Sequence, residues 1–382
     1  MQYQNPFKPT AGKMPPVLVG REKVTDDFLE GLANGEGAPG RLMRITGPRG
    51  SGKTVLLSEL ASIAEDEGWL VVNVSGSGDL LASLSRRLMR KSLFSEIVFK
   101  AQSPLVSIEA RRGSANLDDF ESILECATRG MTKRGKGLLV TIDEVQDASR
   151  DDIREIATAV QFMIRENQNI ALVFAGITTG VLDILNGKSV TFLRRAKPEE
   201  LDAIPLDEVR DSLRDTIANS GFKIEEEALA LATDATQGYA YLIQLVGYHV
   251  WRTAWLRGRR GDGVIVVSVD DATRGVAAAR DEFKSAVLET AITGLPKTAI
   301  DFILAMSETR DVVSTSKIAS MLKRTTGYLS PYRRQLISRQ VIEQTAPGYV
   351  TFSIPLMKEY LAEERASILS RYGGIGPPPI HV

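Results

Sequence analysis

Hydrophobic residues between positions 41 and 206 alternate between short apolar runs and longer stretches with helical spacing. The apolar runs lie at residues 42–45, 69–74, 138–142 and 170–175, and the helical spacing occupies residues 54–67, 80–89, 117–132 and 151–167. Strands that are apolar on both faces and are separated by helices are typical of a parallel sheet that helices cover on both sides. We therefore expect an α/β fold. Residues 94–116 have no clear period and predict a loop or an insertion.

The regions on either side of this segment have other patterns. Prolines disfavour regular structure before Val17, and residues 21–33 have the spacing of a short helix. After residue 206 the pattern predicts helices at residues 206–220, 225–236, 239–256 and 269–291, with a short strand at 264–267. Ser268 and Asp271 predict a capping box at the start of the last of these helices. A mainly helical segment after an α/β segment indicates a second, smaller module.

Composition limits the chemistry that this chain can perform. The 382 residues include 47 Lys and Arg against 48 Asp and Glu, so any surface for nucleic acid must be local. The single cysteine, Cys126, cannot form an internal disulfide. With only His249 and His381 beside it, zinc sites and Ser-His or Cys-His catalysis are disfavoured. Because there is no apolar run of about 18 residues and no signal-peptide pattern, we expect a cytoplasmic protein with no membrane partner.

The strongest motif follows the apolar run at residues 42–45. It consists of Gly47, Pro48, Arg49, Gly50, Ser51, Gly52, Lys53 and Thr54, which match G-x-x-x-x-G-K-[ST] between a strand and an amphipathic helix. In such a loop the backbone N–H groups and the positive end of the helix dipole surround phosphate groups. We expect Lys53 to bridge the β- and γ-phosphates and Thr54 to bind Mg²⁺. A glycine-rich turn that binds nothing is the alternative.

An acidic pair, Asp143 and Glu144, directly follows the apolar run at residues 138–142. Two adjacent carboxylates at the end of a buried strand are costly without a partner. A magnesium ion held by Asp143, with Glu144 orienting and deprotonating a water molecule, would supply that partner. An exposed acidic turn is the alternative, and the phosphate loop at residues 47–54 argues against it.

These two motifs, with Val19-Gly20-Arg21-Glu22 ahead of them, resemble the Walker A and Walker B motifs of the AAA+ and STAND ATPases. The closest likeness is to the branch of the Orc/Cdc6-like proteins and the archaeal-type ATPases, and it covers nearly the whole chain. The resemblance implies ATP and Mg²⁺ as cofactors. It also implies a P-loop NTPase sheet in which the strand at residues 170–175 separates the strands that carry the two motifs.

The resemblance further implies residues that respond to the nucleotide. Thr178 or Thr179 would lie near the γ-phosphate as a sensor, and Arg195, preferred over Arg194, would reach the nucleotide of a neighbouring subunit. A solvated basic turn is the alternative for the two arginines. Relatives carry an arginine or a G-x-P motif in the lid, whereas residues 237–241 have neither. The absence of both features is as compatible with slow hydrolysis, which would set the lifetime of a switch, as with the rapid turnover of a motor.

Pattern and resemblance together divide the chain into five regions. These are an N-terminal arm and helix at residues 1–40, a P-loop ATPase core at 41–206, a helical lid at 207–294, a winged helix-turn-helix at 295–366 and a disordered tail at 367–382. In the fourth region Ser330 and Pro331 predict a helix start, and residues 341–352 predict two strands about a turn, the wing.

The predicted winged helix has an uneven charge. Between Val312 and Ile342 there are six basic residues and no acidic one. We expect the helix after Ser330 to present Arg333, Arg334, Gln335 and Ser338 to double-stranded DNA, because Arg and Gln suit the edges of guanine and adenine. A winged helix that contacts only protein, with a solvated basic face, is the alternative.

The sequence thus predicts an ATP-hydrolysing switch that acts on DNA, with a homo-oligomer or a protein partner as its possible assemblies. In this switch ATP closes the lid and repositions the winged helix. The residues expected to act in hydrolysis are Glu144, Lys53, Thr178 and Arg195. The second interpretation is a nucleotide-sensing regulator or protein-interaction module with little turnover. A third interpretation, a P-loop kinase, has weak support because no part of the sequence resembles a site for a phosphate acceptor. We expect Trp251 and Trp255 in the lid core, a structural His249 and a buried Cys126.

Overall fold

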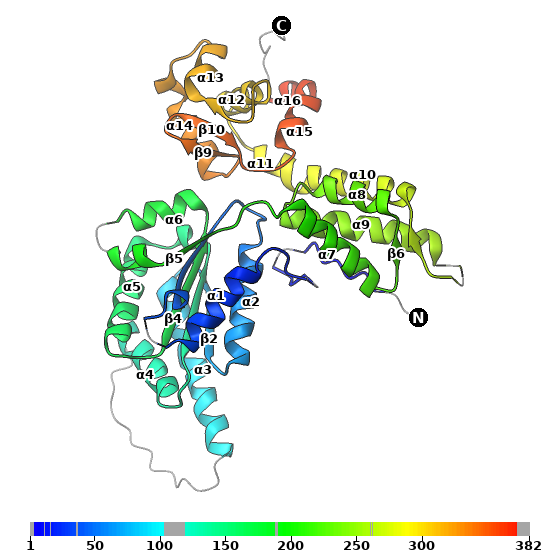
Figure 1. Ribbon diagram of the computed structural model, residues 1–382. Helices are drawn as coiled ribbons and strands as arrows, with labels where there is room; N and C mark the ends of the chain where they lie inside the picture. The colour runs from blue at the N-terminus through cyan, green and yellow to red at the C-terminus, as the bar shows by residue number, and fades with distance from the viewer. Residues whose placement is uncertain are drawn as a thin grey trace. The chain divides into compact units, whose positions relative to one another are not determined.

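The computed structural model describes residues 4–10, 12–15, 17–35, 37–102, 119–187, 190–259, 261 and 263–372. The chain forms two units, drawn in Figure 1. The core unit comprises Thr10–Asp202, and the helical unit comprises Met1–Pro9 together with Ala203–Val382.

The core unit contains a five-stranded sheet with the strand order β2-β3-β4-β1-β5, in which every pairing is parallel. Its strands are β1 (Leu42–Thr46), β2 (Leu70–Ser75), β3 (Leu138–Asp143), β4 (Ile170–Gly176) and β5 (Lys197–Glu200). The predicted α/β class is confirmed, and β4 separates β1 from β3 as the resemblance implied. Since the carboxyl ends of parallel strands lie at one edge, the phosphate loop after β1 and the acidic pair at the end of β3 share that edge.

Helices cover both faces of this sheet (Figure 1). They are α1 (Glu22–Ala33), α2 (Lys53–Asp66), α3 (Leu80–Gln102), α4 (Phe120–Thr132), α5 (Arg150–Arg165) and α6 (Thr178–Leu185), with the 3₁₀ turns η1 (Pro39–Arg41), η2 (Val145–Asp147) and η3 (Thr191–Arg195). Alternate residues of β3 enter different cores because side chains alternate along a strand. Leu139 packs with α1 and α2, whereas Leu138 and Val140 pack with α3, α4 and α5.

Two helices of the core unit differ from expectation. Residues 94–102, for which the sequence left a loop or an insertion open, are helical because α3 runs to Gln102; residues 103–118 lie outside the described residues. No Gly or Pro occurs between Leu80 and Gln102, so the helix continues where its hydrophobic period is lost. Cys126 is exposed, because the buried stripe of α4 passes through Ile123, Leu124 and Ala127 and leaves Cys126 outside it.

Two elements of the core unit had no clear signal in the sequence. Strand β5 reads Lys-Pro-Glu-Glu and lies at the edge of the sheet, where proline and charged side chains are tolerated. Helix α6 has only eight residues, which is too short for a helical period to be distinctive.

The helical unit begins with four helices and a two-stranded parallel sheet. These are α7 (Leu206–Asn219), β6 (Lys223–Ile224), α8 (Glu226–Thr236), α9 (Ala240–Gly258), β7 (Val266–Val267) and α10 (Val269–Phe283). A π-helical turn, η4 (Lys284–Leu288), connects α10 to α11 (Glu289–Ile292). The predicted capping box of α10 is confirmed: Ser268 Oγ accepts a hydrogen bond from Asp271 N at 3.3 Å, and Asp271 Oδ2 accepts one from Ser268 N at 3.0 Å.

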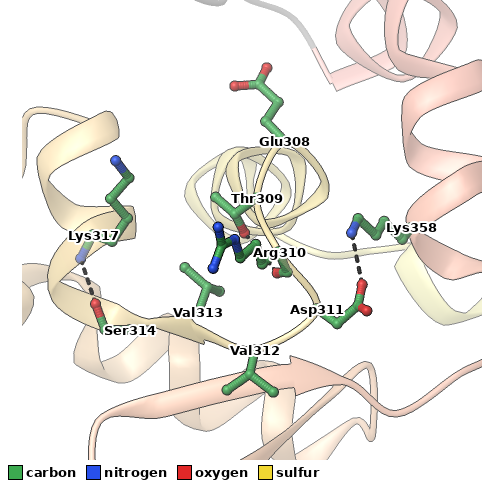
Figure 2. Close-up of a pocket in the computed structure, with 9 residues that line it drawn as sticks. All are labelled: Glu308, Thr309, Arg310, Asp311, Val312, Val313, Ser314, Lys317 and Lys358. Atoms are coloured by element: carbon green, nitrogen blue, oxygen red, sulfur yellow. Dashed lines mark hydrogen bonds and ion pairs between the residues drawn. The ribbon is translucent and has the colours of Figure 1, made fainter.

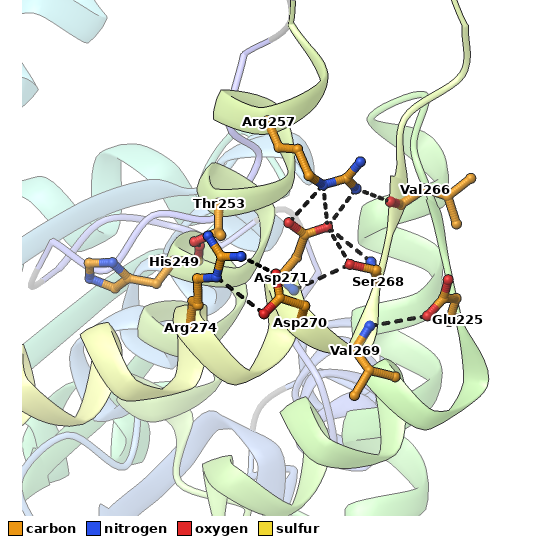
Figure 3. A network of polar contacts seen from close by, with 10 residues as sticks. All are labelled: Glu225, His249, Thr253, Arg257, Val266, Ser268, Val269, Asp270, Asp271 and Arg274. Atoms are coloured by element: carbon orange, nitrogen blue, oxygen red, sulfur yellow. Dashed lines mark hydrogen bonds and ion pairs between the residues drawn. The ribbon is translucent and has the colours of Figure 1, made fainter.

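A polar network joins α9 to α10 around this capping box, as Figure 3 shows. Arg257 Nη2 on α9 donates to Asp271 Oδ2 at 2.6 Å and also to the carbonyl oxygen of Val266 at 2.7 Å. Asp271 is buried, so its charge is paired as burial requires. The contact raises the pKa of the Arg257 guanidinium through its hydrogen bond to Asp271. Residues Ser268 and Asp271 therefore fix both the start of α10 and its position against α9.

Residues 4–10 of the predicted N-terminal arm form no helix or strand, yet this segment is anchored to α9. Phe7 is fully buried, and a Cβ added to Gly247 would lie 2.3 Å from its ring. Asn5 Nδ2 donates to the carbonyl of Tyr248 at 3.0 Å. Of the two tryptophans of α9 that were expected in the core, Trp251 is buried with its ring 4.6 Å from that of Phe222, whereas Trp255 is only half-buried. His249 is buried as expected, and its Nε2 lies 2.7 Å from Glu282 Oε2.

The last part of the helical unit follows α11 in the order helix, strand, two helices, two strands, two helices. Its elements are α12 (Lys297–Ser307), β8 (Val313–Ser314), α13 (Thr315–Met321), α14 (Thr326–Ser338), β9 (Ile342–Ala346), β10 (Tyr349–Phe352), α15 (Met357–Glu363) and α16 (Arg365–Tyr372). The three strands form an antiparallel sheet in the order β8-β10-β9.

Two boundaries in this part differ from expectation. Helix α14 starts at Thr326 rather than after Ser330, and Thr325 Oγ1 accepts a hydrogen bond from Tyr328 N at 3.2 Å as its cap. Pro331 lies inside the helix, one turn beyond the start, where its missing N–H removes a single backbone hydrogen bond. Helix α16 extends to Tyr372, so residues 367–372 of the predicted tail are helical, and residues 373–382 lie outside the described residues.

Candidate nucleotide site

The loop between β1 and α2 has a backbone that depends on glycine. Gly50 and Gly52 have φ angles of 74° and 94°, in the left-handed region that other residues rarely adopt. A Cβ added to Gly47 would lie 2.8 Å from the carbonyl oxygen of Leu201. Gly52 is also the N-cap of α2, so the loop passes directly into the end of the helix where the backbone N–H groups have no intrahelical partner. This is a backbone arrangement suited to an anion.

Lys53, the first residue of α2, is held in this loop. Its Nζ donates to the carbonyl oxygens of Gly47 at 2.9 Å and Pro48 at 2.7 Å, and the residue is only 5% exposed. Burial lowers the pKa of Lys53 below its ordinary value, although the carboxylates of Glu144 and Asp143 oppose that effect. A buried cation in this loop gains an oppositely charged partner when an anion binds there.

Ser51 supplies an independent test of whether a ligand fits the loop. Its hydroxyl oxygen is buried and has no hydrogen-bond partner. Buried polar groups in native structures are nearly always satisfied, so each exception needs an explanation such as a ligand or an ion. A phosphate oxygen in the loop would accept a hydrogen bond from Ser51 Oγ. The residues present therefore fit a nucleoside polyphosphate.

The acidic pair meets the phosphate loop through one short contact. Thr54 Oγ1 on α2 donates to Asp143 Oδ2 at the end of β3, at 2.6 Å. Two oxygen donors this close, on a hydroxyl and a carboxylate, fit Mg²⁺, which is usually bound by one or two protein oxygens together with phosphates and water. Among the residues that the structure describes, no group of three or more His, Cys, Asp and Glu side chains could hold a metal ion. A Mg²⁺ ion at Thr54 and Asp143 would therefore need phosphate oxygens and water as its other ligands.

Glu144 has an unusual backbone and a partner that the sequence did not single out. Its φ is 48°, in the left-handed region, and it precedes the turn η2. Gln146 Nε2 donates a hydrogen bond to Glu144 Oε2, and Gln146 Oε1 accepts one from Ile177 N at 3.1 Å. In the sequence, Gln146 is marked only by its position three residues after Asp143. Neither hydrophobic periodicity nor composition sets it apart from its neighbours.

The residues expected to sense the nucleotide lie at the ends of neighbouring elements. Thr178 is the first residue of α6, just after β4, and is half-buried; Thr179 is exposed. In η3, Arg194 Nε donates to the carbonyl of Leu185 at 2.7 Å, which ties it to α6. Arg195 is exposed and makes no hydrogen bond or ion pair with the residues that the structure describes. The roles of Thr178 and Arg195 remain predictions.

The residues predicted to contact DNA all lie on α14. Arg334 and Ser338 are exposed, whereas Arg333 and Gln335 are half-buried. Ser338 Oγ donates to the carbonyl of Gln335 at 2.9 Å, within the helix itself. Tyr328, near the start of α14, is 45% exposed. The face that α14 presents therefore combines polar, cationic and aromatic groups.

A separate hollow of 820 Å³ lies in the helical unit, between the end of α12, β8, α13 and α15 (Figure 2). Its charged lining consists of Glu308, Arg310, Asp311, Lys317 and Lys358. Lys358 Nζ pairs with Asp311 Oδ1 at 2.8 Å, and Glu308 pairs with Arg365 on α16 at 2.7 Å. Cations and carboxylates are mixed in this hollow, and both of its carboxylates are paired with cations.

Comparisons with known families assign the two ends of the chain differently. Residues 17–174 match the AAA ATPase domain, and residues 285–361 match a domain of unknown function, DUF8462. No curated protein matches the sequence. The chain thus carries a P-loop domain of the AAA ATPase kind. None of the described helices combines the length and apolar character needed to cross a membrane.

Several solved structures share the fold. Cdc6p from Pyrobaculum aerophilum is 17% identical, with a TM-score of 0.51 over 96% of this chain and 98% of its own. ORC2 from Aeropyrum pernix is 16% identical, with a TM-score of 0.59 over 95% and 97%. A Walker-type ATPase from Pyrococcus abyssi is 16% identical, with a TM-score of 0.62 over 90% and 96%. The fold is therefore that of the Orc/Cdc6-like P-loop ATPases.

Proposed function

We propose that the AAA ATPase domain binds ATP with Mg²⁺ at the phosphate loop and hydrolyses it slowly, as a switch. The observation that carries this proposal is the 2.6 Å contact between Thr54 Oγ1 and Asp143 Oδ2, which joins the loop to the acidic pair beside the buried Lys53. The backbone N–H groups of residues 47–54 and the start of α2 would bind the phosphates, and Lys53 would neutralise the β- and γ-phosphates. Thr54 and Asp143 would hold Mg²⁺, which supplies charge neutralisation on the phosphate oxygens.

Glu144 is the proposed general base. It follows Asp143 directly at the end of β3, which is the edge of the sheet where the phosphate loop also lies. There it would orient the attacking water molecule and accept its proton. Thr178, at the start of α6, would contact the γ-phosphate, and Arg195 would act on the nucleotide of a second subunit. The exposure of Arg195, in contrast with the tied Arg194, supports this choice.

The proposed output is binding of double-stranded DNA by residues 295–366 as a winged helix. Two observations support it: the order of elements from α12 to β10, and the six basic residues without an acidic one between Val312 and Ile342. Because recognition helices usually present their N-terminal residues to base edges, the start of α14 at Thr326 adds Tyr328 to the proposed contacts Arg333, Arg334, Gln335 and Ser338. The guanidinium of Arg324 lies 5.2 Å from the ring of Tyr328, which places a further cation on this face.

A regulator that senses nucleotide with little turnover is the second candidate. The lid turn at residues 237–241 has neither the arginine nor the proline that relatives use, which favours slow hydrolysis or none. The rate of phosphate release with and without double-stranded DNA distinguishes the two candidates. Strong stimulation by DNA is expected for the proposed switch, whereas negligible turnover under both conditions would favour the sensor and reject the switch.

A further inference from the structure

Gln146 connects two parts of the core unit that meet at the carboxyl edge of the sheet. It lies in η2, after β3, and its side-chain amide lies between the Glu144 carboxylate and the backbone at the end of β4. On one side Nε2 donates to Glu144 Oε2; on the other, Oε1 accepts from Ile177 N at 3.1 Å. Ile177 directly precedes Thr178, the proposed sensor. A single amide thus bridges the proposed base and the segment that carries the proposed sensor.

The two contacts fix the orientation of this amide. A carboxylate only accepts hydrogen bonds and a backbone N–H only donates them, so the NH₂ group must face Glu144 and the carbonyl must face Ile177. Reversing the amide would place an oxygen against the carboxylate and an NH₂ group against an N–H. Glutamine is suited to both partners at once, because it offers a donor and an acceptor at the end of one side chain.

Close packing holds the side chain in this position. A Cβ added to Gly176 would lie 2.4 Å from Gln146 Oε1, and one added to Gly180 would lie 2.5 Å from Gln146 Cβ. The last residue of β4 and the third residue of α6 therefore leave the space that Gln146 fills. The turn η2 alone does not explain why two glycines, at the end of β4 and in α6, leave space for this one side chain.

We infer that Gln146 is a positioning residue for hydrolysis: its amide holds Oε2 of Glu144 and leaves Oε1 to take the proton of the attacking water molecule. This inference rests on the proposed role of Glu144 as general base. It adds that the position of the Glu144 carboxylate is tied, through Gln146 and the N–H of Ile177, to the end of β4. Any shift of the sensor segment at Thr178 then also moves the base.

Two substitutions separate the polar role of Gln146 from its packing role. Gln146→Glu keeps the shape but puts an oxygen where the NH₂ group faces Glu144, and Gln146→Met keeps the length but removes both polar ends. We expect kcat for ATP to fall at least about tenfold in each, because a misplaced catalytic group commonly costs more than that. The KM for ATP and the affinity for ATP should not change, and both variants should stay folded at the assay temperature although the lost contacts lower the thermal midpoint. The neighbouring exposed residue offers the control, Asp147→Asn, with wild-type kcat.

A second experiment uses Glu144→Gln protein as the starting point and measures its residual ATP turnover at high protein concentration. In Glu144→Gln protein, adding Gln146→Met should cause no further loss, because Gln146 acts through Glu144. Wild-type kcat in both single variants would overturn the inference, and so would an equal loss in the Glu144→Gln background or a loss of ATP affinity that matches the loss of kcat. These results leave the proposed function intact if wild-type protein hydrolyses ATP and the turnover of Glu144→Gln protein is at least about 100-fold lower. Absence of wild-type hydrolysis overturns both proposals.

Discussion

Lys53 has a charge at a position where water hardly reaches it, and its ammonium group donates hydrogen bonds to the carbonyls of Gly47 and Pro48. Around it lie a hydroxyl without a partner, on Ser51, and two carboxylates that favour its charged form. Such an arrangement is costly in the protein by itself and is relieved by an anion with a metal ion. The side chains at this site therefore favour the binding of a negatively charged ligand.

The pH dependence of stability should report the burial of Lys53. Burial lowers its pKa, so at neutral pH the folded protein holds a buried ammonium group that the unfolded chain solvates. This penalty on the free energy of unfolding is relieved as the pH rises through the lowered pKa towards the ordinary value of 10.5. Relative to Lys53→Met protein, the wild type should gain about 1.4 kcal/mol for each unit of lowering. Urea denaturation of both proteins over this pH range measures it, and a difference that is independent of pH would contradict the assignment.

The proposed base has its own test in Glu144→Gln. The amide keeps the size of the side chain but cannot take a proton, so turnover should fall at least about 100-fold while ATP still binds. Phosphate release and equilibrium ATP binding are measured in parallel. Glu155→Gln, at an exposed position on α5, is the matched control. Turnover that survives in Glu144→Gln protein would assign water activation to another group.

Helices and strands with a strong hydrophobic pattern were predictable from the sequence. The four apolar runs became β1 to β4, and the phosphate loop and acidic pair could be placed because they follow two of those runs. Elements without a pattern were not: β5 is charged, and the end of α3 has lost its period. The start of α14 was misplaced because Thr325 and Ser330 can both cap a helix, and local sequence does not decide between them. Gln146 was missed because its two partners meet only in the folded sheet.

Capping of α14 offers a matched pair of substitutions. Thr325→Ala removes the hydroxyl that accepts from Tyr328 N, so the free energy of unfolding should fall by about 1 kcal/mol. Ser330→Ala, at the position where the sequence predicted the cap, lies inside the helix and should cost much less. Thermal or urea unfolding of the two variants measures the difference. Equal destabilisation, or a larger effect at Ser330, would move the start of α14 back to the predicted position.

At the scale of the whole molecule, the chain combines a P-loop core unit with a helical unit whose last part carries a local excess of positive charge. The net charge of the chain is only -1, so an excess confined to residues 312–342 is a feature of that surface and not of the composition. A cytoplasmic location, association with a second copy and separate lid and winged-helix modules remain predictions. Nucleotide binding by one unit and DNA binding by the other are the two halves of the proposed switch.

DNA binding is tested at α14. Arg334→Ala should weaken binding of double-stranded DNA and, if Arg334 meets a phosphate, reduce the slope of log affinity against log salt by about 1. Fluorescence anisotropy at several salt concentrations measures both quantities. Lys23→Ala, at an exposed position on α1, should bind as the wild type does. Wild-type protein without any salt-dependent affinity for DNA would reject this half of the switch.

Equilibrium binding of ATP in the presence of Mg²⁺ tests the central claim most directly. Calorimetric titration of wild-type protein should show saturable binding of one ATP per chain, and Lys53→Ala should abolish it because the buried cation that meets the phosphates is gone. The Lys23→Ala protein should retain the wild-type affinity. Absence of binding to the wild type, or the same affinity in Lys53→Ala protein, would contradict the account.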